Sequence, residues 1–212
     1  MSRRGERGRF LVLDGVDGCG KSTQARLLSE ALAAEGRTPL HVREPGGTAL
    51  GEALRERLLF GDEPLSAEVE VLLFAAARRQ MLERVVAPAL ETGRDVVCER
   101  SNASTFAYQA VAGGLDEERV LGLLLGWCNT PAPDLALWLD LPVEVARTRL
   151  DARADRIEAR GLDFQRAVAR GFARWAERTG ALVRVDAAGA QDEVRARILG
   201  AVRSHAEGVR PA

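Results

Sequence analysis

Short hydrophobic runs alternate along the chain with longer segments in which apolar residues recur every three or four positions. The short runs predict buried β-strands at Phe10–Asp14, Leu40–Arg43, Asp95–Glu99, Leu135–Asp140 and Leu182–Asp186. The longer segments between them predict amphipathic helices. Strands that alternate with helices favour a mostly parallel, doubly wound α/β sheet.

The helical periodicity also indicates where each helix begins and ends. Pro88 is expected to end or kink the longest of them, because proline lacks a backbone N–H. No repeat or linker divides the 212 residues, so we expect one domain over 1–212, with flexible ends at 1–8 and 207–212. The expected helices are Lys21–Glu35, Leu50–Leu59, Ser66–Glu91, Ser104–Ala112, Asp116–Cys128, Val143–Arg153, Asp163–Thr179 and Gln191–His205.

Composition narrows the class of protein. The formal net charge of −1 argues against a broad cationic surface for nucleic acid, and 46% hydrophobic residues argue against a disordered chain. The apolar runs are too short for a bilayer and the first residues lack a signal-peptide pattern, so we expect a cytoplasmic protein without a membrane partner. Cys19, Cys98 and Cys128 share no metal-ligand spacing, which predicts neither a disulfide framework nor a zinc site.

A glycine-rich loop follows the first predicted strand and opens the first predicted helix. Two glycines four residues apart, then lysine and a hydroxyl residue, form the pattern of a phosphate-binding loop. Its glycines let backbone N–H groups turn toward phosphates, Lys21 reaches the outer phosphates, and Ser22 offers a hydroxyl to Mg²⁺. Lys21 is also the only lysine among 30 basic residues. We therefore predict a nucleoside triphosphate site at Gly15, Val16, Asp17, Gly18, Cys19, Gly20, Lys21, Ser22 and Thr23.

This loop alone does not define a reaction, because motors, switches and kinases share it. The chain has no Asn-Lys-x-Asp segment of the kind that reads guanine, which disfavours a GTPase. A kinase and a nucleotide-dependent switch both remain open at this point.

Several side chains at the carboxyl ends of the predicted strands favour a second ligand site. Phe74 and Arg78 lie one turn apart on one helix, so a ring and a guanidinium face the same side. Glu99 and Arg100 end the third strand, where open α/β sheets bind ligands. Each residue alone is more often structural, and only their joint placement indicates a site for a flat, charged molecule.

These residues carry a resemblance to the thymidylate kinase family over almost the whole chain. The resemblance rests on Gly15–Thr23, Arg43–Thr48 with Gly51, Glu52 and Arg55, Leu73–Arg78, Glu99–Arg100, Ser104–Gln109, Pro133–Leu135 and Asp155–Glu158. It implies a P-loop fold of the nucleoside monophosphate kinase type, with a five-stranded parallel sheet and an arginine-rich lid at about 149–161. It further implies ATP- and Mg²⁺-dependent phosphorylation of dTMP to dTDP in dTTP synthesis. The alternatives are another nucleoside or deoxynucleoside monophosphate kinase and a non-catalytic switch.

The resemblance also implies roles for individual residues. Phe74 would stack on thymine, Tyr108 would pack against the deoxyribose, and Asp17 would approach its 3′-hydroxyl or the metal shell. Ser22 and Glu99 would serve the metal. The remaining roles are base recognition by Arg78, Thr105 and Gln109, and binding of the acceptor phosphate by Arg55 and Arg100.

Catalysis would then depend on cations around the transferred phosphoryl group. Some family members carry a catalytic arginine in the phosphate loop and others in the lid. Gly18 occupies the loop position here, so the resemblance implies a lid arginine, Arg153 first and Arg149 next. Lys21, Arg100 and Glu99 complete the implied catalytic set.

One segment of this chain departs from the family's usual sequence. Glu99-Arg100-Ser101 stands where the family usually has Asp-Arg followed by Tyr or His, and the longer carboxylate is expected to shift the magnesium-bound water or the acceptor phosphate.

The family forms homodimers. The apolar run Val69–Ala77, with Leu82, Val85 and Val86, would supply either that interface or core.

Overall fold

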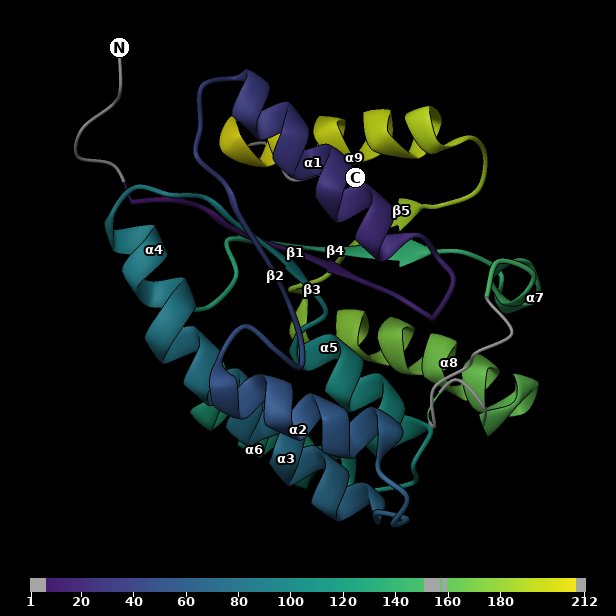
Figure 1. Ribbon diagram of the computed structural model, residues 1–212. Coiled ribbons are helices and arrows are strands. Elements are labelled where there is room, and N and C mark those ends of the chain that lie inside the picture. The colour runs from purple at the N-terminus through teal and green to yellow at the C-terminus, as the bar shows by residue number, and fades with distance from the viewer. Residues whose placement is uncertain (1–6, 151–156, 158–159, 209–212) are drawn as a thin grey trace.

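The computed structural model describes residues 7–150, 157 and 160–208, and its strands form one parallel sheet (Figure 1). The strand order is β2-β3-β1-β4-β5, so β1 lies at the centre. All five predicted strands are confirmed, with β3 and β5 each beginning one residue later than expected. The bounds are β1 Phe10–Asp14, β2 Leu40–Arg43, β3 Val96–Glu99, β4 Leu135–Asp140 and β5 Val183–Asp186.

Helices cover both faces of the sheet, because a parallel sheet needs a crossover after each strand. Figure 1 shows α1 and α9 over one face and the remaining long helices over the other. The first layer is α1 (Lys21–Ala34) and α9 (Gln191–Ala206). The second contains α2 (Ala49–Phe60), α3 (Ala67–Met81), α5 (Asn102–Thr105), α6 (Glu117–Trp127) and α8 (Leu162–Thr179).

The long helix after α2 continues past Pro88, where the sequence predicts either an end or a kink. Helical backbone continues through a π-helical turn, η1 (Leu82–Val86), into α4 (Ala87–Glu91), so Pro88 does not end it. The Ala87 N–H donates to the Leu82 carbonyl, which closes the wider turn. Pro88 follows directly in α4, and the wider π turn before it accommodates a residue that has no N–H to donate.

The helix predicted over Val143–Arg153 is also wrong in length. The observed helix, α7 (Val143–Arg147), ends early, and the next N–H groups donate three residues back instead of four. The Thr148 hydroxyl donates to the Val145 carbonyl and so competes for the acceptors that a longer helix would use. Residues 151–153 of the predicted helix lie outside the described residues.

The core surrounds the central strand. Every residue of β1 is buried, and Phe106 and Phe172 are fully buried beneath the sheet. Trp138 from β4 stacks on Phe172 from α8 with their ring centroids 6.2 Å apart. Among the described helices, none is long and apolar enough to cross a membrane.

A buried carboxylate joins the starts of three strands. Asp95 has no exposed side-chain surface and accepts hydrogen bonds from the guanidinium groups of Arg9 and Arg37 and from the Arg9 backbone N–H at 2.9 Å. Burial raises the pKa of Asp95, but the hydrogen bonds from Arg9 and Arg37 outweigh it and leave the pKa below 3.8. Ion pairs therefore hold together the amino ends of β1, β2 and β3, at the end of the sheet opposite the candidate site.

We expect Asp95→Asn to lower the free energy of unfolding at pH 7 by roughly 2 kcal/mol, because the four hydrogen bonds from the Arg9 and Arg37 guanidinium groups lose their acceptor charge. The folded pKa is depressed, so the wild-type advantage is complete above the ordinary pKa of 3.8 and is lost as pH falls through the folded pKa. Urea unfolding across this range measures the difference. Exposed Asp62→Asn is the control, and equal stability of Asp95→Asn and wild type at pH 7 would contradict the prediction.

Candidate active site

The phosphate-binding loop runs from the end of β1 to the start of α1. Gly15, Gly18 and Gly20 all have positive φ, at 143°, 80° and 100°, which side chains rarely adopt. Lys21 turns back across the loop, and its Nζ donates to the carbonyls of Gly15 and Val16 at 3.0 and 2.7 Å. Its ammonium is thereby held inside the loop.

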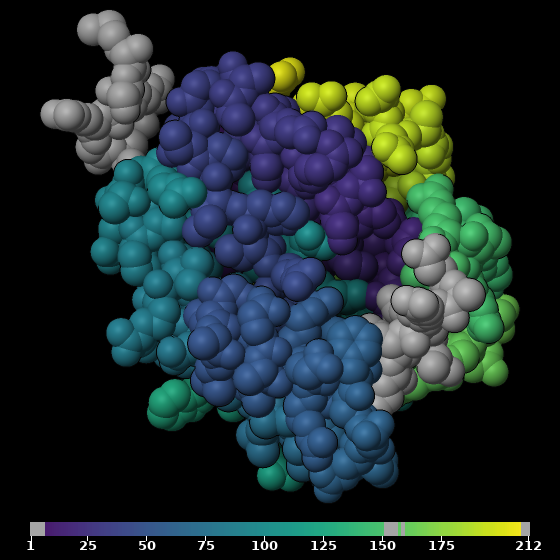
Figure 2. Space-filling model, in the orientation of Figure 1, coloured from purple at the N-terminus to yellow at the C-terminus, as the bar shows by residue number. Residues whose placement is uncertain are grey.

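This loop forms one wall of a cleft of about 950 Å³. Figure 2 shows the surface hollowed between the purple segment near the loop and the blue segment of α2. The structure brings together nearly all of the predicted site residues here. The predicted residues that line the cleft are Asp17, Gly18, Cys19, Gly20, Lys21, Ser22, Thr23, Arg55, Phe74, Arg78, Glu99, Arg100, Thr105, Tyr108, Gln109 and Arg149.

Gly15 and Val16 support the loop from behind and do not line this cleft. A Cβ on Gly15 would lie 2.7 Å from the Leu139 carbonyl oxygen, so β4 leaves no room for a side chain there. Val16 is buried, and its contribution is the carbonyl that holds Lys21. Both residues shape the loop, and neither places a side chain on the cleft wall.

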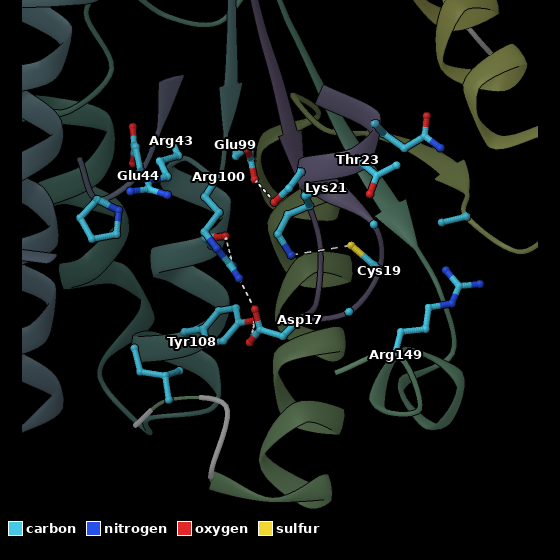
Figure 3. A pocket seen from close by; sticks show the side chains of 18 of the residues that line it. Asp17, Cys19, Lys21, Thr23, Arg43, Glu44, Glu99, Arg100, Tyr108 and Arg149 are labelled. Atoms are coloured by element: carbon cyan, nitrogen blue, oxygen red, sulfur yellow. Dashed lines mark hydrogen bonds and ion pairs between the residues drawn. The ribbon is translucent and has the colours of Figure 1, made fainter. Parts of the chain in front are cut away.

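Asp17 connects the loop to the far wall of the cleft. Its carboxylate accepts a hydrogen bond from the Tyr108 hydroxyl at 2.7 Å and forms an ion pair with Arg100, and Figure 3 shows both side chains converging on it. The Arg100 guanidinium also lies 5.3 Å from the Tyr108 ring centroid. Arg100 is the only described residue other than glycine with positive φ, at 70°, which marks strain at this position.

The electrostatics of this cluster follow from its burial. Burial raises the pKa of Asp17, but Arg100 and Lys21 outweigh it, so the pKa lies below its ordinary 3.8. Burial and the neighbouring Asp17 charge hold the pKa of Tyr108 well above 10. Near neutral pH the cluster therefore contains an ionised Asp17, a charged Arg100 and a neutral Tyr108.

Arg78 is fixed by a partner that the sequence analysis did not identify. The buried Glu44, after β2, forms an ion pair with the Arg78 guanidinium at 2.5 Å, and Arg78 Nη2 donates to the Thr105 hydroxyl at 3.0 Å. Arg78 Nη1 and Glu44 Oε1 are buried without a partner in the described part of the chain. Unpaired polar atoms of a buried ion pair indicate a place for a ligand.

Ser22 and Glu99 both line the cleft, and their side chains hydrogen-bond to each other. The second oxygen of Glu99 lies 2.8 Å from His41 Nε2. Burial raises the pKa of Glu99, but His41 and Ser22 outweigh it and lower the pKa below 4.5. A hydroxyl and an ionised carboxylate beside a phosphate loop fit Mg²⁺, which takes oxygen ligands and completes its shell with water and phosphate.

Ser101, which stands where the family usually has Tyr or His, forms a hydrogen bond to the buried Asp14. The Ser101 and Ser104 hydroxyls donate to opposite oxygens of the buried Asp14, the former at 3.0 Å and the latter at 2.5 Å. Ser101 thus ties the chain after β3 to the end of β1. At this position, a hydrogen bond between the carboxyl ends of β3 and β1 takes the place of the family's usual aromatic ring.

The lid arginines are only partly described. Arg149 lines the cleft, on the far side of the loop from Arg100 (Figure 3). Arg153, the first choice for the catalytic lid arginine, lies outside the described residues. Gly18 itself packs so closely on α7 that a Cβ would lie 2.1 Å from the Ala146 carbonyl oxygen. No side chain fits at that loop position, which agrees with a catalytic arginine elsewhere.

Sequence reasoning also missed residues that have no local signature. The segment after β5 lines the far end of the cleft through Ala187, Gly189, Ala190 and Gln191, with Val194 on α9. Gln165 on α8 donates to Asp17 at 3.3 Å.

The predicted helix Ser104–Ala112 begins two residues earlier, as α5, and continues as a π-helix, η2 (Phe106–Val111), that bears Tyr108 and Gln109. Local π geometry is frequent at functional sites, but no sequence pattern indicated it here.

Known proteins match this chain over most of its length. The model of the family described as thymidylate kinase matches residues 13–198. This chain belongs to the thymidylate kinase family. Relatives named thymidylate kinase include one from Synechococcus sp. (strain JA-3-3Ab), 47% identical over 92% of this chain and 95% of its own, and one from Gluconobacter oxydans (strain 621H), 45% identical over 92% and 94%. Another, from Paracidovorax citrulli (strain AAC00-1), is 44% identical over 91% of each chain.

We expect Gly18→Ala to weaken ATP binding by about tenfold or more, because a side chain at this close approach must displace the loop from α7. The matched control is Gly36→Ala, which has nearly the same φ of 79° but nothing within 4 Å of the new Cβ. Both variants should lose about 1–2 kcal/mol of stability from backbone strain. Calorimetric titration with ATP measures the difference, and equal affinity in the two variants would refute the role given to this contact.

Proposed function

We propose that this member of the thymidylate kinase family transfers the γ-phosphoryl group of ATP to dTMP, giving dTDP and ADP. The observation that carries the proposal is the shared cleft, in which a phosphate-binding loop faces a second basic cluster. Asp17 and Arg100 join the two walls. Such an arrangement fits a reaction between two phosphorylated molecules better than it fits a switch, which binds only one.

The donor side of the proposed reaction begins at Lys21. Its ammonium donates to the carbonyls of Gly15 and Val16, and donor phosphates would take over these hydrogen bonds. Arg149 lies on the same wall. With Arg153, it is proposed to neutralise charge on the transferred group.

The acceptor side needs no general base, because a phosphate oxygen is already nucleophilic. Arg55 and Arg100 are proposed to hold the acceptor phosphate in line with the donor. Arg55 Nη1 donates to the Pro45 carbonyl at 3.2 Å, so its guanidinium is held at the cleft wall. Positioning and electrostatic stabilisation would thus supply the rate enhancement.

Base and sugar recognition are proposed for the deeper part of the cleft. Phe74 offers a ring face. Nη1 of Arg78, which has no partner among the described residues, offers a donor to a base carbonyl. Thr105 and Gln109 complete the polar edge. Tyr108 and Asp17 are proposed to contact the deoxyribose, with the Tyr108 ring packed where a 2′-hydroxyl would otherwise lie.

Mg²⁺ is proposed as the cofactor, held by Ser22 and, directly or through water, by Glu99. When bound, the ion would neutralise charge on the donor phosphates during transfer. His41 keeps Glu99 oriented from the outer side of β3 at 2.8 Å. The substrates are nucleotides of the cytoplasm, where we place the enzyme.

We also propose a homodimer, built on exposed apolar side chains of α2, α3 and α6. In the run Val69–Ala77, Val69 and Leu72 are exposed. The residues Val71, Ala75 and Ala77 of the same run are buried, so one face of α3 packs in the core and a second face is left uncovered. Figure 1 shows these three helices side by side below the sheet. The other exposed apolar side chains on them are Leu50, Phe60, Leu125 and Trp127.

The proposed reaction predicts a clear preference in a panel of dTMP, dUMP, UMP, CMP, dGMP and AMP, assayed for product with ATP and Mg²⁺. We expect dTMP to be phosphorylated best, and Lys21→Ala to lose at least about a hundredfold in kcat/KM, because the donor phosphates lose their cation. Chromatography of the product mixture measures both effects. ATP binding without transfer to any acceptor in the panel would refute the kinase and leave the switch.

The proposed dimer predicts that a charge at the exposed apolar face prevents association. We expect Leu72→Arg to be monomeric, because an unpaired guanidinium would be buried in the interface. Val145 is also an exposed apolar residue, but it lies on α7, away from the proposed interface, and Val145→Arg should stay dimeric. Sedimentation equilibrium measures the mass of each, and a wild-type monomer would rule the dimer out.

A further inference from the structure

A buried acidic residue, Glu70, lies behind the proposed base site without lining the cleft. Its side chain on α3 has no exposed surface, and it is one turn before Phe74. Glu70 Oε2 accepts a hydrogen bond from Gln109 Nε2 at 3.1 Å, and Glu70 Oε1 accepts one from Arg160 Nη2 at 2.5 Å. A carboxylate at this depth is costly unless its partners repay the loss of hydration, so its position calls for a role.

The pair with Gln109 determines which end of that amide faces the ligand. An amide has a donor end and an acceptor end, and a carboxylate paired with arginine accepts hydrogen bonds only. The reversed amide would place Gln109 Oε1 against Glu70 oxygens, an arrangement of like partial charges. Glu70 therefore retains the NH₂ group and leaves the carbonyl oxygen for the cleft. Gln109 lines the cleft, and its Oε1 accepts no hydrogen bond from the described residues.

Arg160 holds Glu70 from the other side. Its guanidinium stacks over the Phe164 ring, 5.0 Å from the centroid, and Phe164 in turn meets the edge of Tyr108 at 6.2 Å. Only about a quarter of the Arg160 side chain is exposed. The carboxylate is thus fixed by a cation that is itself packed, and it cannot rotate away from Gln109 without breaking this pair.

We propose that Glu70 is a positioning residue for base specificity, because it orients the Gln109 amide so that the carbonyl oxygen faces the acceptor base. An acceptor at that point pairs with a base whose ring nitrogen carries a proton, as in thymine and uracil. It opposes cytosine, whose corresponding ring nitrogen is itself an acceptor. This inference rests on the proposed function, and it assigns the choice of pyrimidine to a residue that does not touch the ligand.

The test compares the affinities for dTMP and dCMP, measured by calorimetry so that no turnover is needed. Glu70→Gln keeps the shape of the side chain but lets it donate as well as accept, which frees the Gln109 amide to reverse. We expect the ratio of dTMP to dCMP affinity to fall by about tenfold or more, with ATP affinity unchanged. Glu68→Gln, on an exposed position of the same helix, is the matched control and should leave the ratio at the wild-type value.

A second comparison separates positioning from a general structural effect. In a Gln109→Ala background, Glu70→Gln should leave the affinity ratio within about twofold, because no amide remains to be oriented. Equal losses in both backgrounds would overturn the inference, as would an unchanged ratio in Glu70→Gln alone.

A structure of the wild type with dTMP covers the case in which Glu70→Gln fails to fold. It should retain the contact between Gln109 and Glu70 with Gln109 Oε1 at the base ring nitrogen, and loss of that contact would overturn the inference. Failure of the proposed function has a different signature, namely dTMP binding without phosphoryl transfer by the wild type. A wild type that binds neither dTMP nor dCMP would refute both.

Discussion

The ion pair between Asp17 and Arg100 joins the phosphate-binding loop to the end of β3, and the geometry of the cleft depends on it. Asp17 belongs to the loop that would hold the donor, and Arg100 belongs to the wall that would hold the acceptor. Tyr108 and Gln165 bring two further helical segments to the same carboxylate. A transfer reaction requires two bound molecules at a fixed separation, and in the proposed reaction this single carboxylate would set that separation before either one binds.

The two ends of the sheet use buried charge in opposite ways. Asp95, at the starts of the strands, has both oxygens occupied by arginines, so its contribution is to stability. At the carboxyl ends, the pair of Glu44 and Arg78 retains an unpartnered atom on each residue in the described structure. Such atoms cost stability in the free protein and favour ligand binding. This buried ion pair therefore keeps unsatisfied polar atoms where a nucleotide would satisfy them.

The sheet could be predicted from the sequence because each strand is a local hydrophobic run, and the phosphate loop because its residues are contiguous. The residues brought together across the fold could not. Glu44 reaches Arg78 from 34 positions away, and Glu70 reaches Gln109 and Arg160 from 39 and 90. Neither glutamate has a neighbour in sequence that would reveal its partner. The π-helical turns and the early end of α7 depend on backbone hydrogen bonds that hydrophobic periodicity does not encode.

Tyr108 is the only tyrosine in the chain, and it is buried with its hydroxyl on Asp17. A fluorinated tyrosine supplied during expression would therefore enter the protein at one position. Its fluorine NMR spectrum would contain a single resonance, from a nucleus inside the cleft beside the Arg100 guanidinium. The fold thus provides a built-in spectroscopic reporter of the acceptor side, which would register occupancy by each nucleotide without any engineered label.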